Sequence, residues 1–365
     1  MTFLIYKDYG MTGKKISAIG FGGMRFIKDN NKYNIDKCAE VVRTANKLGI
    51  NYFDTAPHYC NDTSEEIMGY AFKDMPNEFY VSTKSREKSG DLVRRSIERS
   101  LKRLGISKIT FFNIWYILSL EDYRSRMVKD GAYQAAYKAK EEGLIEHIVF
   151  STHCNGDDIE TIVKEGFFEG VTLGYNILNF PFRQKGLKAA YEHGLGVATM
   201  NPLSGGLIPQ RHDYFDFIKE FENQSVVEVA LKFNASHKEI TTVLAGMCSI
   251  EEVIQNAQFG NSINSLNEEK LKSLKTKLLS SMDYLCTGCR YCDSCPNNVR
   301  IPELMLSYNQ KTLGQVQDAV TWLNGQWRLK PEATNLCVEC GKCEKLCTQH
   351  IPIVNRLREI KKWLV

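Results

Sequence analysis

The stretch Ile50-Asn-Tyr-Phe-Asp-Thr-Ala-Pro-His-Tyr59 joins an apolar, strand-like run ending in Asp54 to a turn that carries Tyr59. A second strand-like run, Phe79-Tyr-Val-Ser-Thr-Lys84, ends in a lysine. If both runs are parallel strands of one barrel, their ends meet at the mouth, where such barrels carry their active sites. A lysine beside a tyrosine favours the tyrosinate, and an aspartate balances the lysine. The three residues therefore predict a tyrosine that can give a proton to a carbonyl. The alternative interpretation is an ordinary buried Asp–Lys pair near a loop tyrosine.

The rest of the chain repeats one pattern, in which a strand-like run is followed by a helix-like segment. Strand-like runs are expected near residues 17–22, 51–55, 79–83, 109–116, 146–151, 170–175, 196–201 and 241–245. Helix-like patterns are expected near residues 35–48, 64–73, 91–104, 132–142, 155–165, 183–193, 225–234 and 249–259. Eight of each in strict alternation predict an α/β fold whose parallel sheet closes into a (β/α)8 TIM barrel. Residues 2–16 predict a hairpin that would plug the floor of this barrel.

Length and composition suit a barrel with a smaller second domain. The 365 residues are 43% hydrophobic and 25% charged, as in ordinary soluble proteins. The formal net charge of +4 is small for this length and gives no case for nucleic acid. The first residues lack the basic start and long apolar core of a signal peptide. The longest apolar stretch, Ile109–Leu120, contains Asn113 and is too short to span a membrane. We therefore expect a cytoplasmic protein.

Several other strand ends carry polar or glycine-rich segments. Gly22-Gly23 lets the backbone approach a ligand closely. Ser151 and His153 offer a hydroxyl and an imidazole, and Tyr175-Asn176 offers a ring and an amide suited to a flat heterocycle. The loop Pro202-Leu-Ser-Gly-Gly-Leu207 follows a strand and suits a pyrophosphate. Ordinary loop structure is the alternative interpretation of each segment.

Eight of the twelve cysteines lie in two tight groups, which indicates metal rather than disulfides in a reducing compartment. The first group is Cys286-Thr-Gly-Cys289-Arg-Tyr-Cys292-Asp-Ser-Cys295-Pro296. The second is Cys337-Val-Glu-Cys340-Gly-Lys-Cys343-Glu-Lys-Leu-Cys347, with the C-x2-C-x2-C-x3-C spacing of bacterial ferredoxins. The first group has two residues before its fourth cysteine but keeps the following proline. Two such sets suit two [4Fe–4S] clusters.

In the ferredoxin pattern, the fourth cysteine of each set ligates the other cluster. We therefore predict one cluster on Cys286, Cys289, Cys292 and Cys347. The other cluster would be held by Cys337, Cys340, Cys343 and Cys295. The alternative is zinc, which also takes four thiolates but usually from separated pairs of cysteines.

With Asp54, Tyr59 and Lys84 in this order, the chain closely resembles the aldo-keto reductases. Further stretches similar to family signatures are Ile19-Gly-Phe-Gly-Gly-Met-Arg25, Gly49-Ile-Asn-Tyr-Phe-Asp-Thr-Ala56, Ser64-Glu-Glu-Ile-Met-Gly69, Ser82-Thr-Lys84, Tyr175-Asn176 and Val243-Leu-Ala-Gly-Met247. The resemblance runs from about residue 5 to residue 260. It implies a barrel that binds a nicotinamide cofactor across its mouth and transfers a hydride to a carbonyl. Tyr59 would be the acid, with Lys84 tuning it and Asp54 supporting Lys84.

The resemblance also implies where the cofactor binds. Ser151 and Asn176 would lie at the nicotinamide, the 202–207 loop at the pyrophosphate and Asn256 at the adenine. The full set that we assign to cofactor binding is Gly22, Met24, Arg25, Ser151, His153, Asn176, Leu203, Ser204, Gly205, Gly206, Leu207, Gly246, Met247 and Asn256.

The chain departs from the family at the fourth catalytic residue, which is usually a histidine at the end of the fourth strand. Trp115 stands at this position, with Asn113 and Tyr116 close by. An indole donates one hydrogen bond but cannot titrate. Losing one polarising donor costs about a hundredfold or more in rate, so the reduction of ordinary carbonyls is in doubt. His58 and His153 are substitutes only if their rings reach the pocket.

A second departure concerns the nucleotide. Family members that use NADPH place basic side chains around the last strand to hold the 2′-phosphate. Between Gly246 and Gly260 this chain has Glu251 and Glu252 but no Lys or Arg. NADP, NAD, weak binding and no nicotinamide binding therefore all stay open.

Over nearly its whole length the chain resembles the subgroup of aldo-keto reductases with a C-terminal ferredoxin-like module. The expected domains are a barrel at 1–265, a linking helix at 266–282 and a mostly helical two-cluster domain at 283–365. Residues 300–330 are expected to form helices that pack this module onto the barrel.

The predicted function is nicotinamide-dependent redox of a small carbonyl or alcohol at the barrel mouth. Iron–sulfur clusters pass single electrons whereas nicotinamide passes a hydride, and the chain has no convincing flavin motif. The clusters would therefore be structural, serve a ferredoxin or flavoprotein partner, or feed a substrate that accepts single electrons. The first alternative is an electron-transfer protein whose barrel no longer reduces carbonyls, which Trp115 favours. The second is a binding or scaffold subunit with structural clusters.

Overall fold

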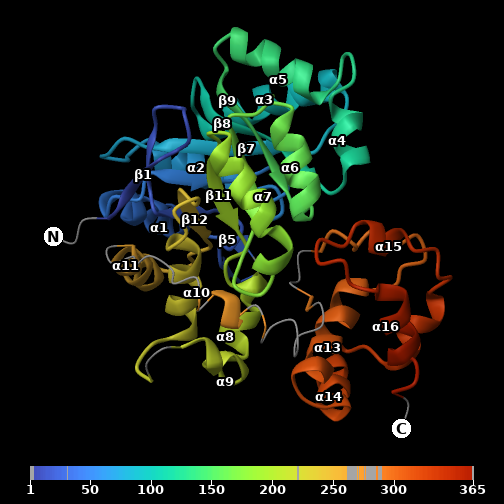
Figure 1. Cartoon of the computed structure of the whole chain (residues 1–365). Coiled ribbons are helices and arrows are strands. Elements are labelled where there is room, and N and C mark those ends of the chain that lie inside the picture. Colours follow the sequence, from blue (N-terminus) through green and yellow to red (C-terminus); the bar gives the residue numbers. More distant parts are fainter. Residues whose placement is uncertain are drawn as a thin grey trace. The chain divides into compact units, whose positions relative to one another are not determined.

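The computed structural model describes residues 4–30, 32–219, 222–260, 269, 271–274, 276, 285–286 and 290–363. The chain divides into two compact units (Figure 1). The first consists of Met1–Pro202 with Val227–Leu266, and the second of Leu203–Val226 with Asn267–Val365. In the described part of the chain, no helix has both the length and the apolarity needed to cross a membrane.

The first unit is a closed barrel of eight parallel strands, in the order β3-β6-β7-β8-β9-β10-β11-β12. These strands are β3 (Ile19–Gly22), β6 (Tyr52–Asp54), β7 (Tyr80–Ser85), β8 (Ile109–Ile117), β9 (Ile145–Thr152), β10 (Gly170–Gly174), β11 (Gly196–Met200) and β12 (Thr242–Ala245). The predicted TIM barrel is confirmed. Nearly every residue of these strands is buried, because one face of a barrel strand points to the interior and the other is covered by helices.

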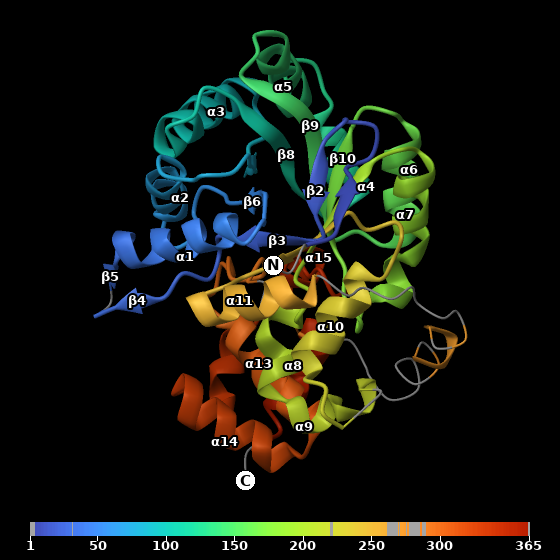
Figure 2. The ribbon, with the colours of Figure 1, turned by 90° about the vertical axis from the view of Figure 1, so that its left-hand side faces the viewer.

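The predicted helices surround the barrel (Figure 2). They are α1 (Ile35–Lys47), α2 (Ser64–Phe72), α3 (Gly90–Leu104), α5 (Ala132–Glu141), α6 (Gly156–Lys164), α7 (Phe180–Glu192), α10 (Val226–Ala235) and α11 (Ile250–Phe259). Three elements were not predicted, namely the strands β4 (Lys28–Asp29) and β5 (Lys32–Tyr33) and the helix α4 (Leu120–Arg126).

The N-terminal hairpin closes the floor of the barrel, as predicted. It pairs β1 (Tyr6–Asp8) antiparallel with β2 (Lys15–Ser17). Tyr9, the residue after β1, is fully buried, and its ring centroid lies 4.5 Å from that of Phe111. A Cβ atom at Gly196 would stand 1.9 Å from the Tyr9 ring. Glycine at the start of β11 is therefore what makes room for the tyrosine.

The second unit is mostly helical. Its described elements are η1 (Ser204–Gly206), α8 (Leu207–Gln210), α9 (His212–Phe215), η2 (Asp216–Ile218), α13 (Ile301–Leu313), α14 (Val316–Trp327), η3 (Pro331–Leu336), α15 (Lys342–Lys345) and α16 (Ile353–Ile360). Apolar residues of α13, α14 and α16 form one core together with Cys286 and Cys292. Helices were predicted between residues 300 and 330, and these helices build the core around the cysteines.

The segment 203–226 follows β11 in the chain but groups with the second unit. Arg211 explains part of this grouping, because its guanidinium donates to Gln310 Oε1 at 2.7 Å and to the Leu313 carbonyl at 3.2 Å. Both acceptors lie on α13. The expected barrel range 1–265 differs from this division, since it includes the segment. Most of the expected linking helix at 266–282 lies outside the described residues, which include only 269, 271–274 and 276 of that range.

Candidate active site and cysteine-lined cavities

Asp54 and Lys84 form a buried ion pair at the mouth of the barrel. Parallel pairing of β6 with β7 sets Asp54 opposite Ser82. The Lys84 ammonium lies 2.8 and 2.9 Å from the two Asp54 carboxylate oxygens and donates to the Thr55 carbonyl at 2.7 Å. The Ser82 hydroxyl donates to the same carboxylate at 2.7 Å. The predicted meeting of the two strand ends is therefore present, and both charged groups are compensated.

Tyr59 lies directly beside this pair. The Lys84 ammonium is 5.0 Å from the centroid of the Tyr59 ring. The neighbours His58 and Cys60 both have positive φ, at 72° and 54°, so the backbone on either side of Tyr59 is locked into an uncommon turn. Such strain accumulates at functional sites.

The pKa of Tyr59 is raised, mainly by burial and also by the charge of Asp54, while Arg25 opposes the shift. This direction differs from the expected stabilisation of a tyrosinate. The physical reason is that burial disfavours the charged tyrosinate, and the nearby negative charge of Asp54 disfavours it further. The structure therefore holds Tyr59 as a neutral phenol with a proton to give.

Trp115 forms the adjacent wall. Its ring meets the Tyr59 ring edge-on, with centroids 5.7 Å apart and an interplanar angle of 86°. Asn113 is not a substitute for the missing histidine, because its amide donates to the Ser82 hydroxyl and the Thr83 carbonyl and accepts from Thr172. Of the residues considered for the fourth catalytic position, Trp115 is therefore the one whose ring contacts Tyr59.

The two histidines considered as substitutes have different positions. His58 is exposed on the Tyr59 loop, and its backbone N–H donates to Asp62 at 3.1 Å. His153 is buried with its ring against Gly174, where a Cβ atom would stand 2.3 Å from Nδ1. The ring of His153 is therefore packed against β10, and of the two only His58 is accessible beside Tyr59.

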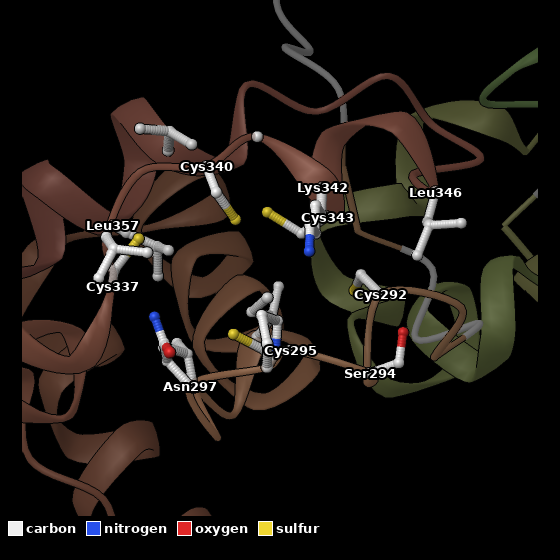
Figure 3. Close-up of a pocket in the computed structure, with 16 residues that line it drawn as sticks. Cys292, Ser294, Cys295, Asn297, Cys337, Cys340, Lys342, Cys343, Leu346 and Leu357 are labelled. Atoms are coloured by element: carbon white, nitrogen blue, oxygen red, sulfur yellow. The ribbon is translucent and has the colours of Figure 1, made fainter.

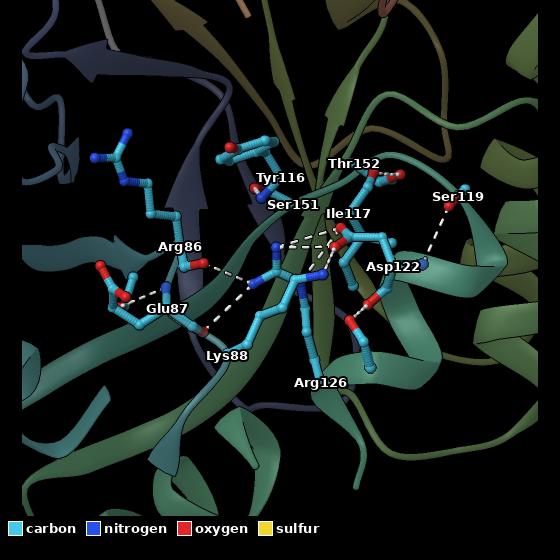
Figure 4. Close-up of polar contacts among 12 residues, drawn as sticks. Arg86, Glu87, Lys88, Tyr116, Ile117, Ser119, Asp122, Arg126, Ser151 and Thr152 are labelled. Carbon is cyan, nitrogen blue, oxygen red and sulfur yellow. Dashed lines mark hydrogen bonds and ion pairs between the residues drawn. The ribbon is translucent and has the colours of Figure 1, made fainter. Parts of the chain in front are cut away.

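Ser151 and Asn176 are both buried, and their side chains are engaged by backbone groups. The Ser151 hydroxyl accepts from the Tyr116 N–H at 2.9 Å (Figure 4). The Asn176 amide donates to the Asn201 carbonyl at 2.9 Å and accepts from the N–H groups of Leu178 and Asn179. Ser151 therefore holds the end of β8 in place, and Asn176 holds the loop after β10.

The loop after β10 also supports a pH-sensitive contact. The Tyr175 hydroxyl and His237 Nε2 are 3.1 Å apart, and His237 Nδ1 lies 2.8 Å from the Phe233 carbonyl. A neutral imidazole satisfies both partners by donating from Nδ1 and accepting at Nε2. Burial lowers the pKa of His237 from its ordinary value of 6.5.

Replacing His237 with glutamine is expected to flatten the pH dependence of barrel stability. With a lowered folded-state pKa, the unfolded chain takes up the proton first as the pH falls. Stability is therefore complete above about pH 7 and falls below 6.5 by at most about 1.4 kcal/mol per pH unit. Anaerobic urea unfolding at pH 7.5 and 5.5 tests this, and equal losses in wild type and H237Q would contradict it.

The remaining cofactor positions fall into two sets. In the first unit, Gly22 lies against β12, and the side chain of Arg25 packs over Gly246. Met24 and Arg25 are exposed, whereas Met247 and Asn256 are buried. The second set, Leu203, Ser204, Gly205, Gly206 and Leu207, belongs to the second unit. There, Ser204, Gly205 and Gly206 all have positive φ, at 51°, 70° and 97°.

The cysteines line two cavities of the second unit. The first is lined by Cys292, Cys295, Cys337, Cys340 and Cys343. Figure 3 shows the sulfur atoms of Cys295, Cys340 and Cys343 turned toward one central space. The second cavity is lined by Cys286, Cys292 and Cys347. Cys289 lies outside the described residues.

These cavities fit iron–sulfur clusters. Apolar residues surround the thiols, including Ile301 and Leu357 in the first cavity and Met305 in the second. Backbone N–H groups donate to sulfur, from Glu339 to Cys337 at 3.4 Å and from Ile351 to Cys347 at 3.3 Å. Such bonds accompany cluster ligation and tune its potential. Within the described residues, no three His, Cys, Asp or Glu side chains are close enough to share one metal ion.

Some residues that complete the active site were not predicted. Ser82 donates to Asp54, and Arg126 is buried and donates to the Arg86 and Glu87 carbonyls after β7. Strand alternation could have found Ser82, because it lies two residues before Lys84 and hence on the same face of β7. No local sequence pattern predicts the contact of Arg126, because this residue lies on α4, far along the chain from the carbonyls that it contacts.

Titratable side chains gathered at the carboxyl ends of a (β/α)8 barrel define an enzyme-type barrel. A model of the aldo/keto reductase family matches residues 18–278, and a model described as a 4Fe-4S dicluster domain matches residues 285–352. The chain belongs to the aldo/keto reductase family. The predicted subgroup, with a C-terminal 4Fe-4S module, is confirmed.

Similar proteins agree with this assignment. L-galactose dehydrogenase from Arabidopsis thaliana is 28% identical over 299 residues, which is 74% of this chain and 92% of that protein. D-threo-aldose 1-dehydrogenase from a Pseudomonas species is 24% identical over 300 residues, with 68% and 90% covered. The similarity to these two enzymes supports the conclusion that this chain is an oxidoreductase of the aldo-keto reductase type.

Solved structures agree on the fold. An aldo-keto reductase from Bacillus halodurans in its holo form gives a TM-score of 0.64 at 23% identity, covering 76% of this chain and 96% of that one. One from Klebsiella pneumoniae, solved in complex with NADPH, gives a TM-score of 0.60 at 18% identity, covering 76% and 95%.

Proposed function

We propose that this protein interconverts a small carbonyl compound and its alcohol at the barrel mouth, using a nicotinamide cofactor. The observation that carries the proposal is the buried Asp54–Lys84 pair beside the partly buried ring of Tyr59. Two relatives named as dehydrogenases of L-galactose and of D-threo-aldoses support a polyhydroxylated carbonyl or alcohol as the substrate type.

When bound, the nicotinamide supplies the hydride. Tyr59 gives its proton to the carbonyl oxygen as charge develops there. Lys84 stabilises the tyrosinate that remains, because its ammonium lies 5.0 Å from the ring. Asp54 fixes the lysine in this position with two short contacts. Trp115 closes the wall beside Tyr59 and offers one N–H donor in place of the family histidine.

The nucleotide is NADP or NAD. Glu251 and Glu252 argue against a 2′-phosphate at the start of α11, where Glu252 instead accepts from the Cys248 N–H at 2.6 Å. Arg25, packed over Gly246, is a positive side chain near the end of β12. A family structure in complex with NADPH favours the phosphorylated form. A direct binding comparison decides between the two.

The test is an anaerobic titration of cluster-replete protein with NADH and with NADPH, following nicotinamide fluorescence. Saturable binding of either cofactor with a micromolar Kd is expected and identifies the nucleotide. An aldehyde screen with the bound nucleotide should then show turnover. No saturation up to millimolar concentration of both would overturn the proposal.

For the second unit we propose two [4Fe–4S] clusters with crossed fourth ligands. The first cavity brings Cys295 and Cys292 together with Cys337, Cys340 and Cys343, and the second brings Cys347 together with Cys286 and Cys292. The clusters would serve electron exchange with a ferredoxin or flavoprotein, or would stabilise the unit.

Alanine variants test the crossed arrangement through iron content. Cys295→Ala should lose about half of the iron, and so should Cys340→Ala. The double variant C295A/C340A should lose no more than either single variant, because both thiols serve one cluster. The double variant C295A/C347A should lose nearly all iron. Nearly complete loss in C295A/C340A would show instead that each sequence group holds its own cluster.

A second candidate function is electron transfer by the iron–sulfur module, with a barrel that no longer reduces carbonyls. Trp115 favours it, because an indole cannot replace a titrating histidine. The two functions separate cleanly in the titration, since only the first requires nicotinamide to bind.

A further inference from the structure

The residue that directly follows β7 is an arginine, Arg86. Arg86 stands two positions after Lys84, at the end of the strand. Arg86 directly follows Ser85, the last residue of β7, so it lies at the carboxyl end of the barrel, where active sites of this fold form. Lys84, in the same strand end, contacts Asp54 and Tyr59.

The main chain at Arg86 is held in place by hydrogen bonds from Arg126 of α4. Buried Arg126 donates to the carbonyls of Arg86 and Glu87 at 3.0 and 3.4 Å (Figure 4). Asp122 fixes Arg126 with a two-point contact at 3.3 Å and also pairs with Lys88 at 2.9 Å. A fixed backbone gives the Arg86 side chain a defined origin, which a binding residue requires.

The Arg86 side chain itself is exposed, and within the described residues its guanidinium has no hydrogen bond or ion pair. Figure 4 shows it extending away from Arg126 and Asp122. It lies within electrostatic reach of His58, whose pKa is lowered first by burial and then by the charge of Arg86. Tyr59 lies in the loop after β6 and Arg86 in the loop after β7, and because these parallel strands are neighbours, both loops lie at the same end of the barrel.

Acidic groups near the mouth do not neutralise this arginine. Asp54 is taken by Lys84, and Asp62 accepts two bonds of 2.7 Å from Arg103. Asp122 is taken by Arg126 and Lys88. Glu65 accepts from the Thr83 hydroxyl at 2.8 Å, and Glu87 is the neighbour of Arg86 on the chain. The Arg86 guanidinium is therefore available to bind an anionic group of a ligand.

We propose that the carbonyl substrate carries an anionic group, a carboxylate or a phosphate, and that Arg86 binds it. A guanidinium binds either group through two parallel hydrogen bonds. The inference rests on the proposed function, since it names the substrate class of the same site. The anion takes no part in bond making: the hydride goes to the carbonyl carbon, the Tyr59 proton goes to its oxygen, and NAD(P)+ is released.

The test compares matched neutral and anionic aldehydes. One pair is 4-nitrobenzaldehyde with 4-carboxybenzaldehyde, and the other is glyceraldehyde with glyceraldehyde 3-phosphate. Arg86→Gln should lower the ratio of anionic to neutral kcat/KM by about 10- to 100-fold, the effect of losing a charge-assisted contact. The pair that shows the loss tells carboxylate from phosphate. Arg86→Lys should restore part of the ratio, because it keeps the charge.

Lys102→Gln is the matched control, because it removes an exposed positive charge in the last turn of α3, away from Arg86. It should leave both ratios unchanged. Unchanged ratios in Arg86→Gln would overturn the inference while carbonyl turnover, and with it the proposed function, stands. Calorimetric measurement of 4-carboxybenzyl alcohol binding tests the opposite case, in which the anion site exists but no aldehyde is turned over. Binding that depends on Arg86 without turnover of any aldehyde would support the anion site and remove the proposed function.

Discussion

Replacing Tyr59 with phenylalanine is expected to lower kcat for carbonyl reduction by about 10²- to 10⁴-fold, which is the usual contribution of a positioned general acid. The variant keeps the ring that lies 5.0 Å from the Lys84 ammonium and edge-on to Trp115. It removes only the hydroxyl. Nucleotide affinity should therefore stay within a few-fold of wild type while the rate falls.

The pH profile supplies an independent readout of the same residue. Burial raises the pKa of Tyr59, so the phenol keeps its proton from neutral into mildly alkaline solution. The rate of reduction should then show no loss attributable to Tyr59 between pH 7 and 9. Tyr137→Phe is the control, because Tyr137 is exposed on α5. A wild-type kcat in Tyr59→Phe would remove Tyr59 from the mechanism.

Replacing Lys84 with methionine is expected to destabilise the barrel by about 3–5 kcal/mol, as when one partner of a buried ion pair is removed. The Asp54 carboxylate would remain buried with the Ser82 hydroxyl and without its counter-charge. The loss should appear in anaerobic urea unfolding at pH 7. Activity should fall as well, because the tyrosinate left after proton transfer loses its stabilising charge.

A double variant separates stability from catalysis in this pair. Asp54→Asn combined with Lys84→Met leaves no unpaired charge, so it should recover a large part of the stability that Lys84→Met loses. It should recover none of the activity. A Lys84→Met variant as stable as wild type would show that the pair is not the buried, desolvated contact described above.

The barrel was predictable because its signals are local and repeated. Each strand is a short apolar run, each helix has its own periodicity, and strict alternation leaves a parallel closed sheet as the outcome. The meeting of Asp54 with Lys84 follows from the same logic, since neighbouring parallel strands bring their ends to one edge. The cysteine spacing likewise indicated the module that the family comparison confirmed.

Other features depend on contacts that no local pattern reveals. Arg211 ties the segment after β11 to α13, a hundred residues further along the chain. Asn113 and Asn176 are engaged by neighbouring groups. The direction of the pKa shift of Tyr59 depends mainly on how deeply the phenol is buried, which a sequence does not show.

We propose that a hydride passes directly from nicotinamide to a carbonyl at the barrel mouth. The most direct test is anaerobic turnover with nicotinamide cofactor carrying deuterium at C4, followed by mass spectrometry of the alcohol. With one of the two isomers deuterated on opposite faces of C4, the alcohol should carry one deuterium on the former carbonyl carbon, and this deuterium should not exchange in H2O. Alcohol that forms without deuterium from both isomers would contradict it, because the electrons would then have come by another route.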